Sequence, residues 1–112
     1  MPALSEADYE ARAYPELAAL VRALDALERE DFEAELAHDM LTVEFADGSK
    51  FIVNSHRAAR QIWMAAERSA WHFDWDQEQG RWIAAKSGDE LWSTLARLLG
   101  QKLGATIELD RA

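Results

Sequence analysis

The fold is decided by the stretch LTVEFADGSKFIVN at residues 41–54, which is followed by QIWM at residues 61–64. Apolar and polar residues alternate in its first half, and Asp47 and Gly48 supply a turn that tolerates positive φ. In the second segment, the two-residue period of a strand sends the aliphatic side chains to one face and Trp63 to the other. The stretch therefore predicts a β-hairpin and a further strand, with Trp63 on the open side of the sheet if the aliphatic side chains face the core.

Two helices are predicted outside this sheet. Within about the first 27 residues, leucine and valine recur at helical spacing, Ser5 is a suitable N-cap, and Pro15 predicts a kinked or two-piece helix. Near the other end, Ser87 and Glu90 have capping-box spacing, and Gly104 can end the helix that follows. The apolar stripe of the first helix consists of Leu17, Leu20, Val21, Leu24 and Leu27.

Between the helices, the period of two predicts five or six strands, at residues 31–36, in the hairpin 40–54, and at 61–66, 71–76 and 81–85. The order helix, consecutive strands, helix is typical of an antiparallel sheet with both helices on one face. We therefore predict an α+β fold, a two-layer α/β sandwich, and one domain over residues 1–112.

Composition limits the function. The 112 residues carry a net charge of −9 and contain no cysteine. The negative charge argues against nucleic-acid binding and favours cations or a basic protein partner. The absence of cysteine excludes disulfides, thiolate metal ligands and thiol catalysis. The acidic N-terminus and the absence of a long apolar run predict a cytoplasmic protein.

Carboxylates gather where the first helix gives way to the first strand. Oxygen ligands of this kind suit hard cations, which a row of surface carboxylates can hold with part of their water retained. The alternative is a solvated charged edge that prevents strands of two molecules from pairing. The candidate metal ligands are Asp25, Glu28, Glu30, Asp31, Glu33 and Glu35.

A second candidate site lies on the polar face of the sheet, where Asn54, Gln61 and Trp63 are expected. Tryptophan and amides on a rigid sheet are typical of protein-docking surfaces, although Trp63 could also pack beneath a loop. His72 and Asp74 share a strand face, but the three histidines lack the spacing of a zinc site. No nucleophile elbow or phosphate-binding glycine loop is present, so we predict that the protein is not an enzyme.

Over residues 5–104 the sequence resembles the bacterial frataxin (CyaY-type) family. The resemblance rests on the order and spacing of several short motifs rather than on any single one. These motifs are Leu41-Thr42-Val43, Asp47-Gly48-Ser49-Lys50, Asn54, Gln61-Ile62-Trp63, His72-Phe73-Asp74, Trp82 and Ser87-Gly88.

The resemblance implies the same two-layer fold and an iron-binding accessory protein, an iron chaperone or regulator of iron–sulfur cluster assembly. It implies that the acidic residues Asp25 to Glu35 bind Fe²⁺ or Fe³⁺ weakly. It also implies docking on a cysteine desulfurase and its scaffold protein through Glu33, Glu35 and the Asn54, Gln61 and Trp63 face.

Arg22 departs from the family pattern, so the acidic ridge is expected mainly on the strand. A monomer with metal-dependent oligomers, and a weak ferroxidase-type activity, remain open under this resemblance. The alternative function is a metal-independent acidic interaction adaptor.

Overall fold

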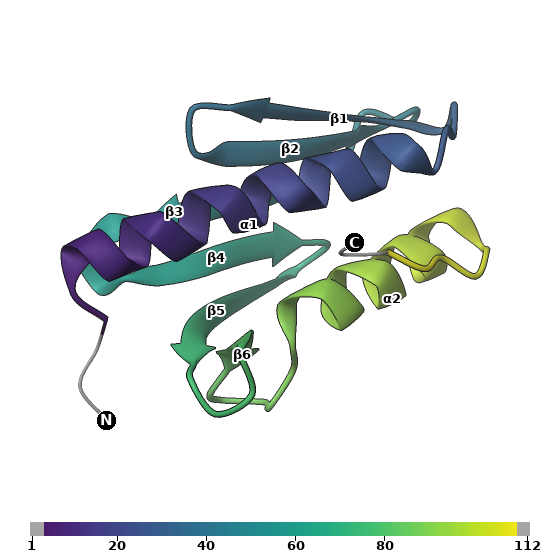
Figure 1. Ribbon diagram of the computed structural model, residues 1–112. Helices are drawn as coiled ribbons and strands as arrows, with labels where there is room; N and C mark the ends of the chain where they lie inside the picture. The colour runs from purple at the N-terminus through teal and green to yellow at the C-terminus, as the bar shows by residue number, and fades with distance from the viewer. Residues whose placement is uncertain (1–3, 110–112) are drawn as a thin grey trace.

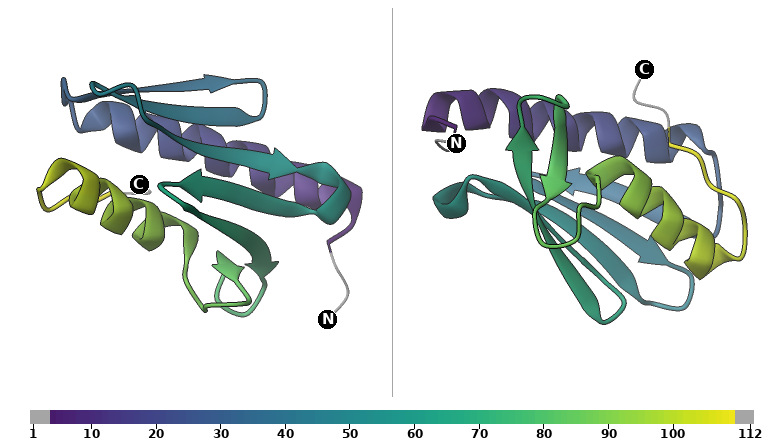
Figure 2. Two further views of the ribbon diagram at one scale, coloured as in Figure 1. Left: turned by 180° about the vertical axis from the view of Figure 1, so that it is seen from behind. Right: turned by 90° about the horizontal axis from the view of Figure 1, so that it is seen from below.

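The computed structural model describes residues 4–109 of the chain. It confirms the predicted α+β sandwich, with six strands in one antiparallel sheet whose spatial order follows the chain. Both helices lie on the same side of that sheet, as the right-hand view of Figure 2 shows. The elements are α1 (Glu6–Ala26), β1 (Phe32–Ala37), β2 (Met40–Phe45), β3 (Lys50–His56), the short 3₁₀ helix η1 (Arg57–Ala59), β4 (Gln61–Ala66), β5 (Ser69–Asp76), β6 (Arg81–Ala84) and α2 (Leu91–Leu103).

Helix α1 starts where the sequence predicts, with the Ser5 side chain accepting a hydrogen bond from the Asp8 backbone N–H at 3.1 Å. The two-piece alternative was wrong, because Pro15 lies inside one continuous helix. A proline inside a helix costs about 3 kcal/mol. Pro15 is exposed, so water can solvate the carbonyl group that its ring leaves unbonded, while the opposite face buries Leu17 and Leu20 completely.

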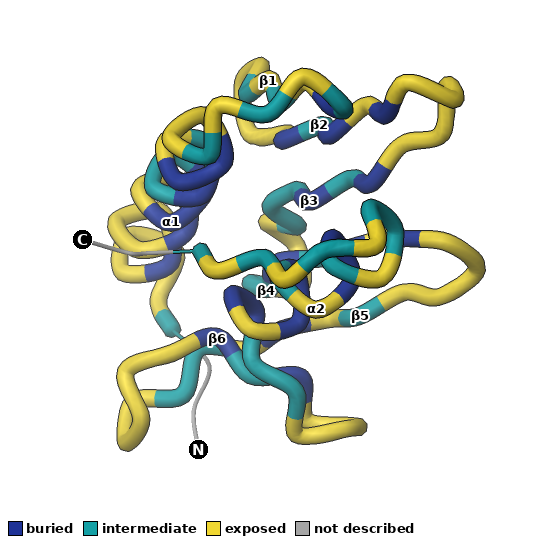
Figure 3. Tube along the Cα trace, turned by 90° about the vertical axis from the view of Figure 1, so that its right-hand side faces the viewer, coloured by how far each residue is buried: buried dark blue, intermediate teal, exposed yellow. Residues whose placement is uncertain are grey.

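The core lies between the helices and one face of the sheet (Figure 1; Figure 3, buried residues in dark blue). The alternation predicted for β2 and β4 is confirmed, since Val43, Ile62 and Met64 are buried while the residues between them are more accessible. Phe73 of β5 is fully buried, whereas Trp71 and Trp75 on the same face are only partly buried.

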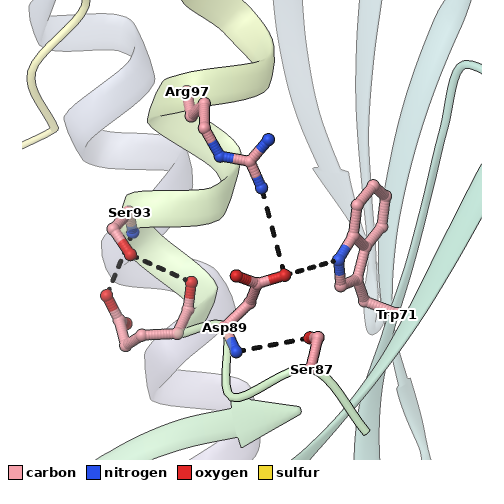
Figure 4. A network of polar contacts seen from close by, with 6 residues as sticks. Trp71, Ser87, Asp89, Ser93 and Arg97 are labelled. Carbon is pink, nitrogen blue, oxygen red and sulfur yellow. Dashed lines mark hydrogen bonds and ion pairs between the residues drawn. The ribbon is translucent and has the colours of Figure 1, made fainter.

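The start of α2 differs from the capping box that the sequence predicted. The N-cap is Glu90, whose carboxylate accepts hydrogen bonds from the backbone N–H groups of Trp92 and Ser93 at 2.8 and 3.0 Å. The Ser87 hydroxyl instead accepts from the Asp89 backbone N–H at 3.3 Å (Figure 4). Glu90 itself pairs with Ile83 of β6, and the N-cap lies three residues after Ser87.

Asp89 connects the start of α2 to the sheet. Its carboxylate accepts a hydrogen bond from the Trp71 indole N–H at 3.2 Å and lies 4.0 Å from the Arg97 guanidinium (Figure 4). At the other end, α2 stops at Gly104, as predicted, in the left-handed conformation with φ 66°. The segment after it returns toward α1, and Ile107 and Leu109 pack against the core.

Candidate functional site

The face of the sheet that points away from both helices carries the second candidate site. Strand register brings the three predicted residues together on this open face. Asn54 of β3 lies directly opposite Trp63 of β4, and Trp63 lies opposite His72 of β5. Gln61 is two residues from Trp63 on the same strand face, so these side chains form one continuous surface across three strands.

Trp63 is only partly accessible to water rather than fully open to it. Its indole lies between two imidazole rings, with centroid distances of 3.7 Å to His56 and 4.1 Å to His72. The interplanar angles of 14° and 13° show that all three rings are stacked nearly parallel. Both faces of the indole are therefore covered by imidazole rings, and Trp63 is half-buried.

Hydrogen bonds fix the orientation of this indole. The Trp63 N–H donates to the Gln61 side-chain oxygen at 2.8 Å, and the Gln61 amide N–H₂ donates to Asp74 at 3.1 Å. Gln61 is in turn anchored from the helical layer, because the Tyr9 hydroxyl donates to its backbone carbonyl at 2.8 Å. Burial raises the pKa of Tyr9, so this hydroxyl keeps its proton over the physiological range.

Sequence reasoning assigned no role to His56 or Tyr9 here. The pairing of His72 with Trp63 follows from the register of the β4–β5 hairpin and could have been read from the chain. His56 is the last residue of β3 and lies opposite Gln61, so the β3–β4 register places it on the open face. The connection between these strands contains η1 and passes through Arg60 in a left-handed conformation with φ 53°. No sequence signal for that non-glycine turn was evident.

The acidic candidates lie along the end of α1, the connection that follows, and the β1 edge. All six are on the surface, and five of them are exposed. Asp25, Glu28 and Glu33 line a cavity of ≈ 310 Å³ between α1 and β1, together with Arg29. Glu35 lies two residues beyond Glu33 on the same strand face, so the structure brings four of the six into one neighbourhood.

Glu44 extends this row of charge across the sheet, because it lies directly opposite Glu33. On its other side Glu44 lies opposite Lys50, which ends the row. Like charges in directly opposite positions repel each other, so this pair gains from a nearby cation. We define the acidic edge as the six predicted carboxylates plus Glu44.

Asp31 already has a cationic partner within the chain. The Arg29 guanidinium donates two hydrogen bonds to its carboxylate, at 3.0 and 2.7 Å. This pairing with Arg29 lowers the pKa of the Asp31 carboxyl and raises that of Arg29. Across residues 4–109, no group of three or more histidine, aspartate or glutamate side chains is gathered closely enough to form a ready metal centre. The acidic edge is therefore an extended field of charge.

Two further sequence-based candidates can be placed. His72 and Asp74 do share a strand face, but Asp74 is engaged by Gln61 and His72 by the Trp63 ring. In the part of the chain that the structure describes, neither helix is long and apolar enough to cross a membrane.

Comparison with known proteins agrees with this architecture. The family model for the frataxin-like domain matches residues 2–105. The iron–sulfur cluster assembly protein CyaY of Ralstonia nicotianae is 35% identical over 112 residues, covering 97% of each chain. The protein of the same name from Cupriavidus pinatubonensis is 37% identical over 113 residues, covering 97% of this chain and 99% of its own.

Solved structures share the fold. Frataxin from Psychromonas ingrahamii superposes with a TM-score of 0.74 at 24% identity, covering 94% of this chain and 97% of its own. A trimeric frataxin from Saccharomyces cerevisiae, complexed with ferrous iron, gives a TM-score of 0.70 at 24% identity, with 93% and 90% covered. On the extent of the family match and of the CyaY alignments, the chain belongs to the frataxin-like family.

Proposed function

We propose that this protein is a non-enzymatic accessory protein of iron–sulfur cluster assembly. It binds iron weakly at the acidic edge and docks on a cysteine desulfurase and its scaffold protein. Two similar proteins are named as iron–sulfur cluster assembly proteins, and these names support a role in that process. The observation that carries the proposal is that one sheet presents both surfaces, with the acidic edge reaching β1 and β2 and the Asn54, Gln61 and Trp63 face on β3 and β4.

The chemistry of the acidic edge suits iron as a cargo. Hard cations take carboxylate oxygens and water, and an exposed carboxylate row offers oxygen ligands without enclosing the ion. Weak, exchangeable binding follows from the absence of a compact ligand cluster among the described residues. Binding of a cation would also relieve the repulsion between Glu33 and Glu44.

Docking on a basic partner follows from the same charges. A net charge of −9 speeds encounter with a positively charged surface, and exposed charges act mainly on the association rate. The aromatic and amide side chains on β3 and β4 of the same sheet then give a rigid contact area. In this proposal the acidic edge attracts the basic partner, and the Asn54, Gln61 and Trp63 face supplies the contact area.

Iron titration of the pure protein tests the cation role. We expect Fe²⁺ to shift the NMR signals of Glu33 and Glu35 saturably, and the double variant Glu33→Gln/Glu35→Gln to lose most of this response. The matched control is Glu78→Gln/Glu108→Gln, which removes two exposed carboxylates elsewhere and should respond as the wild type does. A wild-type protein whose acidic-edge signals ignore iron would remove the cation role.

Arg29 provides an opposite test, in which affinity should rise. Replacing it by glutamine frees the Asp31 carboxylate from two hydrogen bonds and removes a positive charge beside Glu28 and Glu33. We expect iron affinity to increase by about two- to fivefold, which is the range of exposed charge pairs. Unchanged affinity would mean that Asp31 takes no part.

Partner binding and iron titration of one charge-reversed variant together distinguish the metal-independent adaptor from this proposal. Glu33→Lys/Glu35→Lys should abolish binding to the cysteine desulfurase under either function. Under the adaptor function, iron titration of this variant would match that of the wild type. Trp63→Ala tests the open face in the same assay, since loss of desulfurase or scaffold binding is expected there too.

A further inference from the structure

Asp74 lies on the open face of the sheet, at the end of a chain of three hydrogen-bonded side chains. The Trp63 indole N–H donates to the Gln61 side-chain oxygen at 2.8 Å, and the Gln61 amide N–H₂ donates to the Asp74 carboxylate at 3.1 Å. Among residues 4–109, Gln61 is the hydrogen-bond partner of the Asp74 side chain. The docking proposed above uses Trp63 and Gln61 and leaves Asp74 without a role.

The chemistry of these groups fixes the direction of the chain. An indole N–H can only donate, and a carboxylate at neutral pH can only accept. The Gln61 amide offers an oxygen that accepts and a nitrogen that donates, so one orientation satisfies both neighbours, with the oxygen toward Trp63 and the nitrogen toward Asp74. If the amide turned over, a donor would face the indole N–H and an acceptor would face the carboxylate. Asp74 therefore keeps the Gln61 oxygen directed at Trp63.

The backbone places Asp74 beside Gln61. Ile62 of β4 pairs with Phe73 of β5, so the neighbouring residues Gln61 and Asp74 stand next to each other on adjacent strands. Strand β5 is paired with β4 on one side and with β6 on the other, and the Tyr9 hydroxyl holds the Gln61 backbone carbonyl from the helical layer. Both ends of the hydrogen bond between Gln61 and Asp74 therefore start from a fixed backbone, although the Asp74 side chain is exposed.

We infer that Asp74 is a positioning residue for docking: through the Gln61 amide it holds the Trp63 indole in the orientation that a partner meets. For docking, this inference rests on the function proposed above. A side chain that is ordered before binding loses less conformational freedom at the interface, which favours the complex. Because the hydrogen bond to Asp74 is exposed, we expect its loss to change partner affinity by about two- to fivefold.

The alternative is that the Asp74 carboxylate meets a basic partner directly, as one more negative charge. Positioning requires an acceptor for the Gln61 N–H₂, which an asparagine oxygen also supplies, whereas direct attraction requires the charge. Asp74→Asn therefore separates the two roles, and Asp74→Ala removes both. Glu78→Ala is the matched control, because Glu78 is an exposed carboxylate that lines the same cavity of ≈ 500 Å³ as Asp74, while the Gln61 N–H₂ donates to Asp74.

NMR of the free protein tests the positioning without any partner. In Asp74→Ala at pH 7 we expect the Trp63 indole N–H signal to move upfield and its exchange with water to quicken by about two- to fivefold, because its hydrogen bond to Gln61 is formed less often. Asp74→Asn should restore most of both values, and Glu78→Ala should resemble the wild type. An indole signal that is unchanged in Asp74→Ala, or that changes equally in Asp74→Asn, would overturn the inference.

Exchanging donor and acceptor provides an independent check. Gln61→Glu keeps an oxygen for the Trp63 N–H but sets a second carboxylate against Asp74, so the indole signal should change as it does in Asp74→Ala. Adding Asp74→Asn to this variant supplies a donor to the new carboxylate and should restore the signal. Failure to restore it would contradict the hydrogen-bonded chain. Should Asp74→Ala not fold, this pair of variants decides.

Affinity for the cysteine desulfurase at pH 7.5 tests the role in docking. We expect Asp74→Ala to weaken binding by about two- to fivefold, and Asp74→Asn to recover most of the loss. Trp63→Phe keeps a ring but lacks the N–H, so Asp74→Ala should have no further effect in that background.

The outcomes separate this inference from the proposed function. Equal losses in Asp74→Ala and Asp74→Asn, with or without Trp63→Phe, would mean direct attraction by the charge, which would contradict the positioning role and leave the proposed function intact. Failure of the wild-type protein to bind the desulfurase would contradict the proposed function, while the spectra of the free protein would still decide whether Asp74 orients Trp63.

Discussion

Trp92 and Trp63 place the same side chain on opposite sides of one sheet. Trp92 of α2 is only 4% exposed, and its indole N–H donates to the carboxylate of Glu16 on α1, which is itself buried. Trp63 of β4 is half-buried, and its indole N–H donates to Gln61 only two residues away. The first contact joins segments 76 residues apart in sequence, whereas the second orients a side chain within its own strand.

The difference shows how a tryptophan can serve stability or contact. On the helical side, the indole N–H and the carboxylate are hydrogen-bonded to each other in a buried environment, where an unsatisfied polar group is costly. On the open side, two imidazoles and an amide hold the indole in one orientation. The following changes test this contrast, starting with the largest effect.

Trp92→Ala should cause the largest loss. It removes a buried indole from between the two helices and leaves the Glu16 carboxylate without this donor. We expect the free energy of unfolding to fall by about 3–5 kcal/mol, measured by urea denaturation at pH 7. A loss below about 1 kcal/mol would mean that the helix layer does not depend on this contact.

Trp63→Ala should weaken partner binding more than it lowers the free energy of unfolding. Because the indole is only half-buried, we expect a loss of about 1–2 kcal/mol in the same denaturation assay. Binding to the desulfurase or scaffold should suffer more than stability does. If Trp63→Ala destabilises the protein as much as Trp92→Ala, the two tryptophans do not differ in the way described.

Tyr9→Phe probes the connection between the two sides. The buried Tyr9 hydroxyl donates to the Gln61 carbonyl group, so its removal should cost about 1 kcal/mol at pH 7. Burial raises the pKa of Tyr9 above its ordinary value of 10.0. Its contribution is therefore fully present below pH 10 and is lost as pH rises through the raised pKa.

The alkaline behaviour gives the check for this variant. Wild-type stability should fall above pH 10 by a component that Tyr9→Phe lacks. Tyr14→Phe is the matched control, since Tyr14 is 52% exposed on the same helix. Parallel alkaline profiles of wild type and Tyr9→Phe would contradict the assignment.

Lys102→Gln should have the smallest effect. The Lys102 ammonium lies 2.7 Å from the Asp47 carboxylate, which also accepts from the Ser49 hydroxyl and backbone N–H. Lys102 first, and then Ser49, lower the pKa of Asp47 far below its ordinary value. The pair therefore stabilises the fold above about pH 4, and this contribution is lost as pH falls through the lowered pKa.

Denaturation at several pH values tests the sign. Lys102→Gln should be slightly less stable than the wild type at pH 7, and the two should converge as the solution is acidified below about pH 4. The same experiment in high salt should reduce the difference at pH 7. A gap that widens on acidification would mean that the sign is wrong.

Much of the fold could be predicted because it depends on local periodicity. Strand β4 occupies residues 61–66, as the alternation around Ile62 and Met64 predicts. The element order predicts an antiparallel sheet with both helices on one face, and the structure confirms it. The errors arose at Pro15 and Ser87, where packing against the sheet and pairing with β6 outweighed a local signal.

By itself, the sequence determined the elements, the two faces of the sheet and the excess of negative charge, because each depends on residue type and spacing along the chain. Only the tertiary structure decided that the His56 ring stacks on the Trp63 indole and that Tyr9 reaches Gln61 across the core. These contacts depend on strand register, on a left-handed turn and on side-chain orientation. Such quantities are fixed when separate segments come together, and no periodicity encodes them.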